Sequence, residues 1–139
     1  DYGKAGIFLV DTGQARKTQN LVEEFLKQCK QDDAFGKMVA REYIPLNNLC
    51  IQSIIDGNVT NFIRHLKILS SWQLLHFRPM IPQGFGEVWE SGFNRKLFYL
   101  KLCGAGGGGF LLGFARNLDA ALQWLSERNF STITVYRSQ

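Results

Sequence analysis

The chain has 139 residues, of which 45% are hydrophobic and 20% are charged, a composition typical of a globular protein with one buried core. Its net charge of +4 comes from 16 basic and 12 acidic residues without a basic run, which is weak support for nucleic-acid binding and fits a site for an anionic small molecule. No signal peptide is visible and no apolar run approaches the roughly 18 residues that span a bilayer, so we expect a cytoplasmic protein without a membrane partner.

The cysteines and histidines indicate neither disulfides nor a metal site. Cys29, Cys50 and Cys103 are odd in number, lack a CxxC pair and sit among apolar neighbours, so free thiols in a reducing compartment are expected. His65 and His76 are far apart and lack paired ligands. The opening DYGKAGIFLVD enters a strand almost at once without an initiator Met, which suggests a segment of a longer protein.

The first predicted elements are a strand and an amphipathic helix. Residues 5–11 (AGIFLVD) form a short apolar run that ends in Asp-Thr-Gly, the pattern of a buried strand and a turn. From about Arg16 to Gln31 the apolar residues follow the i, i+3, i+4, i+7 spacing of a helix, with charged residues opposite. The apolar positions are Val22, Phe25, Leu26 and Cys29.

A second helix is expected from an aspartate cap, Asp32 or Asp33, to about residue 55, where a Gly-Asn pair closes it. Pro45 lies inside this stretch. Because proline lacks an amide hydrogen and clashes with the preceding turn, we expect the helix to kink or split near Tyr43.

A third helix is predicted over residues 60–75, with Phe62, Leu66 and Leu69 on one face. Residues 76–86 (HFRPMIPQGFG) hold two of the three prolines and are predicted to be a loop. A short helix over residues 87–92 follows.

The last third of the chain is predicted to be mostly strand. Residues 96–103 (KLFYLKLC), 110–115 (FLLGFA) and 130–137 (FSTITVYR) are rich in aromatic, aliphatic or β-branched residues. Asn117 is expected to cap a helix between the second and third of these strands. The apolar face of that helix would hold Leu118, Ala121, Leu122 and Leu125.

The predicted order is therefore β-α-α-α-α-β-β-α-β. It indicates one α+β domain over residues 1–139, with a ferredoxin-like, mostly antiparallel sheet of about four strands and helices packed on one face.

The stretch YLKLCGAGGGGFLLGFA holds five of the fourteen glycines between Gly104 and Gly109. Its strongly apolar flanks argue against a flexible linker, and a hairpin turn needs only two glycines. A loop of bare peptide units can direct several N–H groups at one point and bind phosphate or carboxylate oxygens, which is the interpretation we favour. No helix follows the run, as a Rossmann site requires, and no Gly-Lys-Ser/Thr follows, as a Walker A loop requires. Too little chain remains for a protein kinase catalytic loop.

The segment Lys101–Gly109 resembles the third signature motif of the GHMP kinases, a Lys-Leu-x-Gly-Ala-Gly-Gly-Gly-Gly sequence in their C-terminal domain. Val10–Val22 resembles the strand, turn and helix that start this domain, where mevalonate kinases carry Arg-x-Thr, here Arg16 and Thr18. The similarity covers nearly the whole chain and is greatest to bacterial mevalonate kinases of the Bacteroidetes type. The resemblance implies a phosphate- and substrate-binding loop with a neighbouring lysine, namely Gly104, Ala105, Gly106, Gly107, Gly108, Gly109 and Lys101.

The resemblance further implies a kinase that transfers the ATP γ-phosphoryl group to a substrate hydroxyl, with mevalonate the best candidate substrate. The family's catalytic Asp, its Mg²⁺ ligands and the loop that wraps the ATP phosphates belong to an N-terminal domain of the same polypeptide. ATP and Mg²⁺ would be bound mainly there, so we expect no catalytic residue or metal ligand in this chain and no activity from it alone. A homodimer of the two-domain parent is also consistent with the resemblance.

Several residues have two possible roles. Lys101 either adds charge near the phosphates or faces solvent on an alternating strand. Arg16 and Thr18 either contact an anionic substrate group or cap a helix, and Asp11 either orients Arg16 or caps a turn. Trp72 and Trp89 either line a substrate pocket or belong to the core. The function itself has two alternatives, a sugar or sugar-phosphate kinase of the same superfamily and a non-catalytic ligand-binding module.

Overall fold

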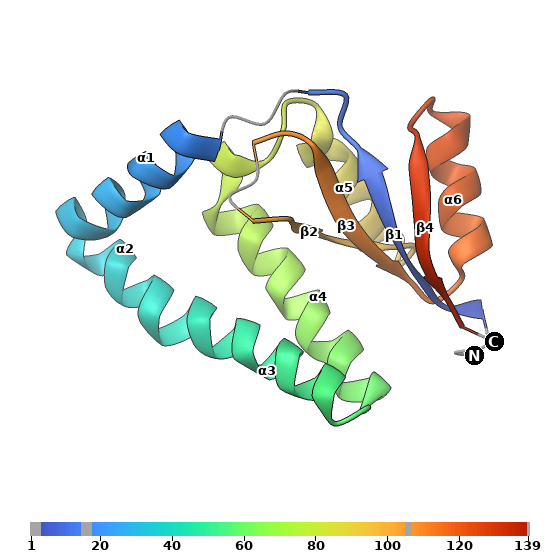
Figure 1. The fold of residues 1–139 in the computed structure, drawn as a ribbon, viewed down its shortest axis with the longest axis horizontal. Coiled ribbons are helices and arrows are strands. Elements are labelled where there is room, and N and C mark those ends of the chain that lie inside the picture. Colours follow the sequence, from blue (N-terminus) through green and yellow to red (C-terminus); the bar gives the residue numbers. More distant parts are fainter. Residues whose placement is uncertain (1–3, 15–17, 105–106, 139) are drawn as a thin grey trace.

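The strands of the sheet come from the two ends of the chain, and the helices between them form its long middle part. The computed structural model describes residues 4–14, 18–104 and 107–138. Its strands are β1 (Gly6–Asp11), β2 (Tyr99–Leu102), β3 (Phe110–Ala115) and β4 (Thr132–Arg137). They form one sheet in the order β2-β3-β1-β4, with every neighbouring pair antiparallel (Figure 1). This is the strand order of a β-α-β-β-α-β, ferredoxin-like arrangement, and it confirms the predicted α+β class.

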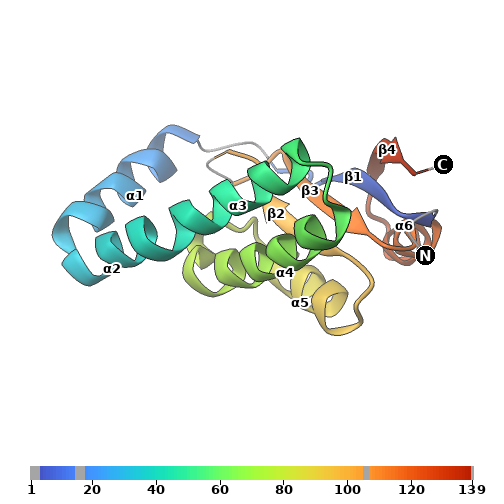
Figure 2. The same cartoon turned by 90° about the horizontal axis from the view of Figure 1, so that it is seen from below.

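Six α-helices hold about half of the described residues. They are α1 (Thr18–Gln31), α2 (Asp33–Met38), α3 (Ile44–Ile55), α4 (Val59–His76), α5 (Phe85–Asn94) and α6 (Leu118–Glu127). Figure 2 shows α3, α4 and α5 side by side, with α4 in the middle. Both α4 and α5 contact β2, whereas α6 contacts β3 and β4.

The predicted second helix is divided where Pro45 requires it. Asp32 caps α2, because its side chain accepts a hydrogen bond from the Phe35 amide at 3.1 Å. A π-helical turn, Val39–Tyr43, then leads into α3, and Pro45 sits in the first turn of α3, where its missing N–H costs little. The split near Tyr43 is confirmed. The π-helical turn was not predicted. It keeps the chain helical between α2 and α3.

Three predicted starts are wrong. The strand expected from residue 130 begins at Thr132, and the other two starts lie next to left-handed backbone. The helix expected from residue 87 begins at Phe85, directly after Gly84, whose φ of 85° redirects the chain. The strand expected from residue 96 begins only at Tyr99, because Lys96 adopts a φ of 55° and turns the chain after α5. The helix capped by Asn117 is confirmed, since its side chain accepts from the Ala120 amide at 3.2 Å.

One face of the sheet carries the main core. Phe8 and Val10 of β1 and Leu111 of β3 are fully buried there, together with Trp89 of α5 and Leu125 of α6. Gly113 lies opposite Phe8 in the strand pairing, and the Phe8 ring occupies the space that a side chain at residue 113 would need. Helices α5 and α6 thus cover one face, as predicted.

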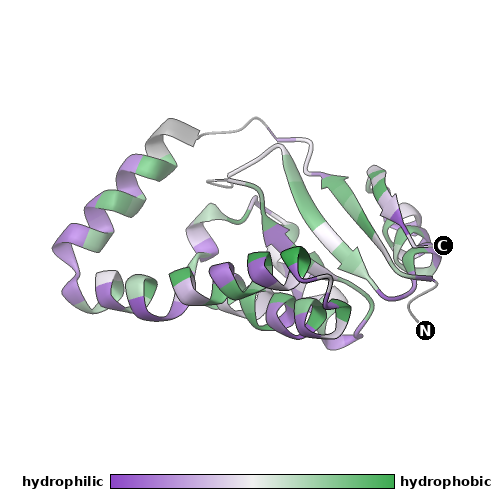
Figure 3. Cartoon of the chain, turned by 60° about the horizontal axis from the view of Figure 1, so that its bottom comes forward, coloured by the Kyte–Doolittle hydropathy of each residue, from purple (hydrophilic) through white to green (hydrophobic). Residues whose placement is uncertain are grey.

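The other face of the sheet is only partly covered. Tyr99 and Phe114 form a second, smaller cluster there with Ile63 and Leu66 of α4. Figure 3 shows the contrast between the mostly hydrophobic strands and α1, whose surface alternates between hydrophobic and hydrophilic residues. Helix α4 therefore lies along the β2 edge and contributes to the rim of the second face.

Candidate functional site

The glycine-rich run connects β2 to β3 in a backbone conformation that suits glycine. The φ angles of Gly104, Gly107, Gly108 and Gly109 are 62°, 78°, 153° and 68°. Residues with a side chain rarely adopt such values, so a substitution at any of these four positions introduces strain. The two remaining predicted loop residues, Ala105 and Gly106, lie outside the described residues. The run is thus a specific loop at the end of the sheet.

Tertiary hydrogen bonds hold this loop from two sides. The Gly107 amide donates to the Met80 carbonyl at 2.6 Å, and the Gly109 amide donates to the Gln14 carbonyl at 2.9 Å. The Gly109 carbonyl accepts from both the amide and the hydroxyl of Thr12, at 2.9 and 2.7 Å. Two of the amides expected to cradle an anion are therefore already paired. The Gly108 amide has no hydrogen-bond partner among the described residues.

A cleft of about 720 Å³ opens beside the loop. It is lined by Gln14, Leu21, Arg78, Pro79, Ile81, Pro82, Gln83 and Gly107. The Gln14 side chain donates to the Gln83 carbonyl at 2.7 Å, which joins the segment after β1 to the segment before α5. The cleft wall thus consists of three segments that are distant in the sequence.

Arg78 supplies the positive charge of this cleft. It belongs to a 3₁₀ turn, Arg78–Met80, and its side chain is 56% exposed. Its Nη2 lies 2.9 Å from Oε1 of Glu90 in α5, so one carboxylate neutralises the guanidinium in part. The N-terminus of α5 adjoins the same region, no side chain caps it, and Gly84 and Gly86 line a second hollow there together with Arg78. A helix N-terminus and a guanidinium both favour an anion.

Lys101 is not among the residues that line this cleft. Its Nζ donates to the Leu102 carbonyl at 2.7 Å, and its side chain is half-buried. It lies close enough to the Cys50 thiol of α3 to act on its titration: burial raises the pKa of Cys50, and the Lys101 charge lowers it in part. Lys101 does alternate with the buried Leu100 and Leu102, as a strand requires.

The other predicted site residues fall in different places. Arg16 lies outside the described residues, and Thr18 is the first residue of α1. The Asp11 side chain accepts from the Gly13 amide at 2.9 Å, which is the turn-capping alternative. Trp72 and Trp89 are buried in the main core, as the packing alternative expects.

The sequence-based interpretation missed Arg78, Gln14 and Gln83. Residues 76–86 are predicted to be a loop because they hold two of the three prolines, and no site residue is assigned there. Arg78 was detectable only as a basic side chain between Phe77 and Pro79, in a chain where basic residues are common. Its proximity to the glycine loop depends on the contact between Gly107 and Met80, which no sequence pattern indicates.

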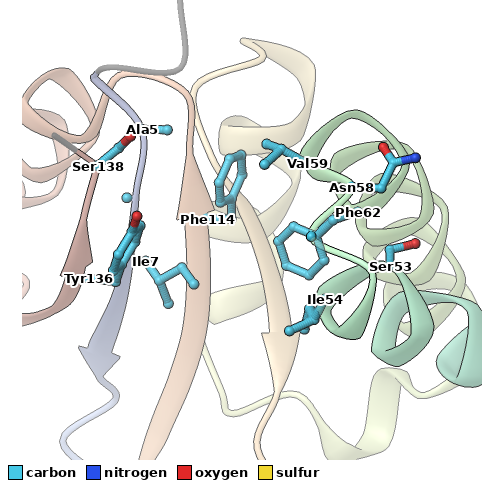
Figure 4. A pocket seen from close by; sticks show the side chains of 12 residues that line it. Ala5, Ile7, Ser53, Ile54, Asn58, Val59, Phe62, Phe114, Tyr136 and Ser138 are labelled. Carbon is cyan, nitrogen blue, oxygen red and sulfur yellow. The ribbon is translucent and has the colours of Figure 1, made fainter.

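A different pocket, of about 270 Å³, lies at the end of the sheet where β1 begins (Figure 4). Its walls are mainly apolar, and the Phe62 and Phe114 rings meet edge to face at 5.9 Å between centroids. Its polar residues are partly engaged elsewhere: the Ser53 hydroxyl donates to the Leu49 carbonyl, and the Asn58 side chain caps α4. This pocket suits an apolar group rather than a phosphate.

Comparison of the chain with protein-family models finds no match, and comparison with curated proteins finds none either. Within the described ranges, no three His, Cys, Asp or Glu side chains are placed to hold a metal ion together. No described helix combines the length and the apolar character that crossing a bilayer demands.

Proposed function

We propose that this chain is the C-terminal domain of a cytoplasmic, ATP-dependent small-molecule kinase of the GHMP type. The observation that carries the proposal is the glycine loop itself. Gly104, Gly107, Gly108 and Gly109 take φ angles that favour glycine, and the loop borders a cleft that contains the guanidinium of Arg78. A backbone kept free of side chains beside a positive charge suits close approach of a phosphate group.

The proposed contribution of this domain is positioning and charge stabilisation. Phosphoryl transfer depends mainly on these two effects, because charge spreads over the transferred group in the transition state. Arg78 offers a fork of N–H donors to phosphate oxygens, and the uncapped start of α5 offers backbone donors. The paired Gly107 and Gly109 amides would instead hold the loop in place. Mevalonate remains the best candidate acceptor.

The remaining machinery would come from the N-terminal domain of the same polypeptide. Mg²⁺ prefers oxygen ligands, and the described residues bring no cluster of carboxylates to the cleft. The described residues alone do not fit a metal site, and we assign them neither the metal nor the catalytic base. We therefore expect the isolated chain to release no ADP.

The test uses the full-length protein with Mg-ATP and, in turn, mevalonate, galactose and heptose phosphates, with ADP release as the readout. Turnover with mevalonate alone supports the proposal in full. Turnover with a sugar alone keeps the chemistry and replaces the acceptor. A Gly107→Ala variant should lose on the order of 10²-fold in rate, because Gly107 lines the cleft and an ångström of displacement at the phosphates has that effect. No turnover and no ATP binding would refute the kinase proposal.

A non-catalytic ligand-binding module is the second candidate. The pocket of about 270 Å³ far from the glycine loop favours it, as does the internal pairing of two loop amides. Such a module would bind an apolar ligand without binding ATP. Titration of the full-length protein with ATP, followed by NMR shifts of the Gly107 and Phe114 amides, separates the two candidates.

A further inference from the structure

The pocket where β1 begins lies between a sheet wall and a helix wall, and hydrogen bonds hold both walls in place. On the sheet side, Ile7 of β1 pairs with Tyr136 of β4 and with Phe114 of β3. Residues paired in this way lie on the same face of a sheet, so the three side chains form one row. Figure 4 shows Phe114 of this row next to Phe62 of α4. The strand register thus fixes the position of the sheet wall.

The helix wall is the turn between α3 and α4. Asp56 ends α3, and Gly57 after it adopts a φ of 68°. The Gly57 amide donates to the Ile54 carbonyl at 3.1 Å, and the Asn58 amide donates to the Ser53 carbonyl at 3.0 Å. These are the two bonds of a Schellman motif, and the Asn58 side chain then caps α4. Because the turn is held in this way, the pocket is formed before any ligand enters it.

The size and the lining of the pocket define what it can hold. An apolar protein cavity of roughly 150 Å³ binds benzene, so a volume of about 270 Å³ has room for one ring with a short chain. None of the lining residues that the structure describes is charged. An ionised group would lose its hydration there without gaining a partner. The part of a ligand that enters the pocket is therefore uncharged.

Two further features favour an aromatic ligand with a hydroxyl group. Phe62, Phe114 and Tyr136 present their rings to the pocket, and a ligand ring can meet them edge to face, which adds to the gain from burial. The Tyr136 hydroxyl has no hydrogen-bond partner in the described part of the chain, and Tyr136 is 57% exposed. The Ser53 hydroxyl and the Asn58 side-chain oxygen are instead already bonded within the chain. Tyr136 is thus the polar group that a ligand can reach.

From these features we propose that the pocket binds a small, uncharged aromatic molecule of about one ring, whose hydroxyl group hydrogen-bonds to Tyr136. Such a ligand would also cover Ile54 and Val59, which are 61% and 46% exposed. Burial of apolar surface that is otherwise in water is the main favourable contribution to binding.

The position of the pocket separates it from the cleft beside the glycine loop. Ile7 pairs with Phe114 at the pocket end of β1 and β3, whereas Asp11 pairs with Phe110 at the loop end. The inference names a ligand class for the second candidate function, but it holds equally for a domain of a kinase. ATP affinity is measured separately, so failure of the kinase proposal and failure of this one can be told apart.

The first test titrates the full-length protein with 4-ethylphenol and follows the NMR shifts of the Phe114 and Gly107 amides. For a ligand of about nine non-hydrogen atoms we expect a dissociation constant of about 1 mM or lower, with shifts at Phe114 and none at Gly107. 4-Ethylcyclohexanol keeps the carbon skeleton and the hydroxyl but lacks the aromatic ring, and 4-ethylbenzoate is charged. Each should bind roughly fivefold more weakly or worse. If either analogue binds as tightly as 4-ethylphenol, or if Phe114 shows no saturable shift, the proposal is wrong.

The second test uses variants at exposed positions, and circular dichroism checks that each keeps its helices. Val59→Trp fills the mouth of the pocket and should weaken 4-ethylphenol binding by roughly tenfold or more. Ile51→Trp is the matched control, because Ile51 is 48% exposed on α3 but does not line the pocket. Tyr136→Phe should weaken 4-ethylphenol binding about threefold and leave the affinity for ethylbenzene unchanged. Equal effects of the two tryptophan variants, or an unchanged affinity of Tyr136→Phe for 4-ethylphenol, overturn the proposal.

Discussion

The side-chain carbonyl of Gln73 in α4 accepts a hydrogen bond from the backbone amide of Leu102 in β2, at 2.9 Å. Gln73 is 1% exposed, and its Nε2 lies 3.4 Å from the Tyr43 hydroxyl. Because β2 is at the edge of the sheet, its outward amides would otherwise have no strand to pair with. One glutamine thus joins the helical layer to the sheet edge.

Replacement of Gln73 by leucine should destabilise the fold markedly. The Leu102 amide would remain buried without an acceptor, which costs about 1–3 kcal/mol of unfolding free energy. Urea denaturation measures the loss. Gln123→Leu is the control, because Gln123 is exposed on α6 and pairs only with Glu127, so its effect should stay below about 0.5 kcal/mol. Equal effects of the two substitutions would contradict this role for Gln73.

Gly113→Ala should also be destabilising, by about 1–3 kcal/mol, because the new methyl group would overlap the buried Phe8 ring. In a thermal-melt double-mutant cycle, Phe8→Leu should remove part of the conflict, so the two effects should not add. Gly86→Ala is the contrasting glycine variant. Its methyl group meets only the flexible end of Arg78, at 2.7 Å, so it should be close to neutral. Strict additivity of the Gly113 and Phe8 variants would contradict the packing argument.

Arg78 should control the affinity of the cleft for polyphosphate. Arg78→Gln removes the guanidinium. We therefore expect the dissociation constant for ATP in the full-length protein to rise roughly tenfold, measured by calorimetry. Glu90→Gln should have the opposite sign, because it releases Arg78 from its carboxylate partner. Arg64→Gln, which removes an exposed arginine of α4 bonded to Asn61, is the charge-matched control. An Arg64 effect equal to that of Arg78 would show that only overall charge matters.

The Cys50 thiol should make stability fall in alkaline solution. Its pKa is raised by burial, so the folded state keeps the thiol proton to a higher pH than the unfolded state does. The resulting stabilisation is complete below the ordinary thiol pKa of about 8.5 and is lost as pH rises through the raised value. Unfolding free energies of the wild type and of Cys50→Ala should therefore converge in that range. Parallel pH curves for the two proteins would argue against the raised pKa.

The sequence predicted the elements that depend on local patterns. Asn117, Asp32 and the split near Pro45 are local signals, and the structure confirms each of them. The strand 110–115 was predicted with its observed bounds. The sequence could not show where a residue other than glycine adopts left-handed backbone, as Lys96 does before β2, because such residues rarely do so and lysine gives no signal for it.

The candidate site was predicted only in part for a related reason. A glycine run is visible in a sequence, but the partners of its amides are not. The contacts of Gly107 with Met80 and of Gly109 with Gln14 join residues far apart in the chain. Gln73 left a weak signal, since it is a polar residue at the i+7 position from Leu66 on a buried helix face. A buried polar group in such a place calls for a partner elsewhere, but the sequence does not say which.

The sheet topology also bears on how the chain emerges from the ribosome. Strand β1 is synthesised before the other strands of this sheet, yet its partners are β3 and β4. Asp11, for example, pairs with Phe110, which is translated much later. At about 5–20 residues per second, translation leaves this apolar strand without its neighbours for roughly 5–20 s. Meanwhile the helices from α1 to α5 can form from contacts between nearby residues. A nascent chain stalled before β3 should therefore be helical but expose an unpaired β1, and it should depend on chaperones to avoid aggregation.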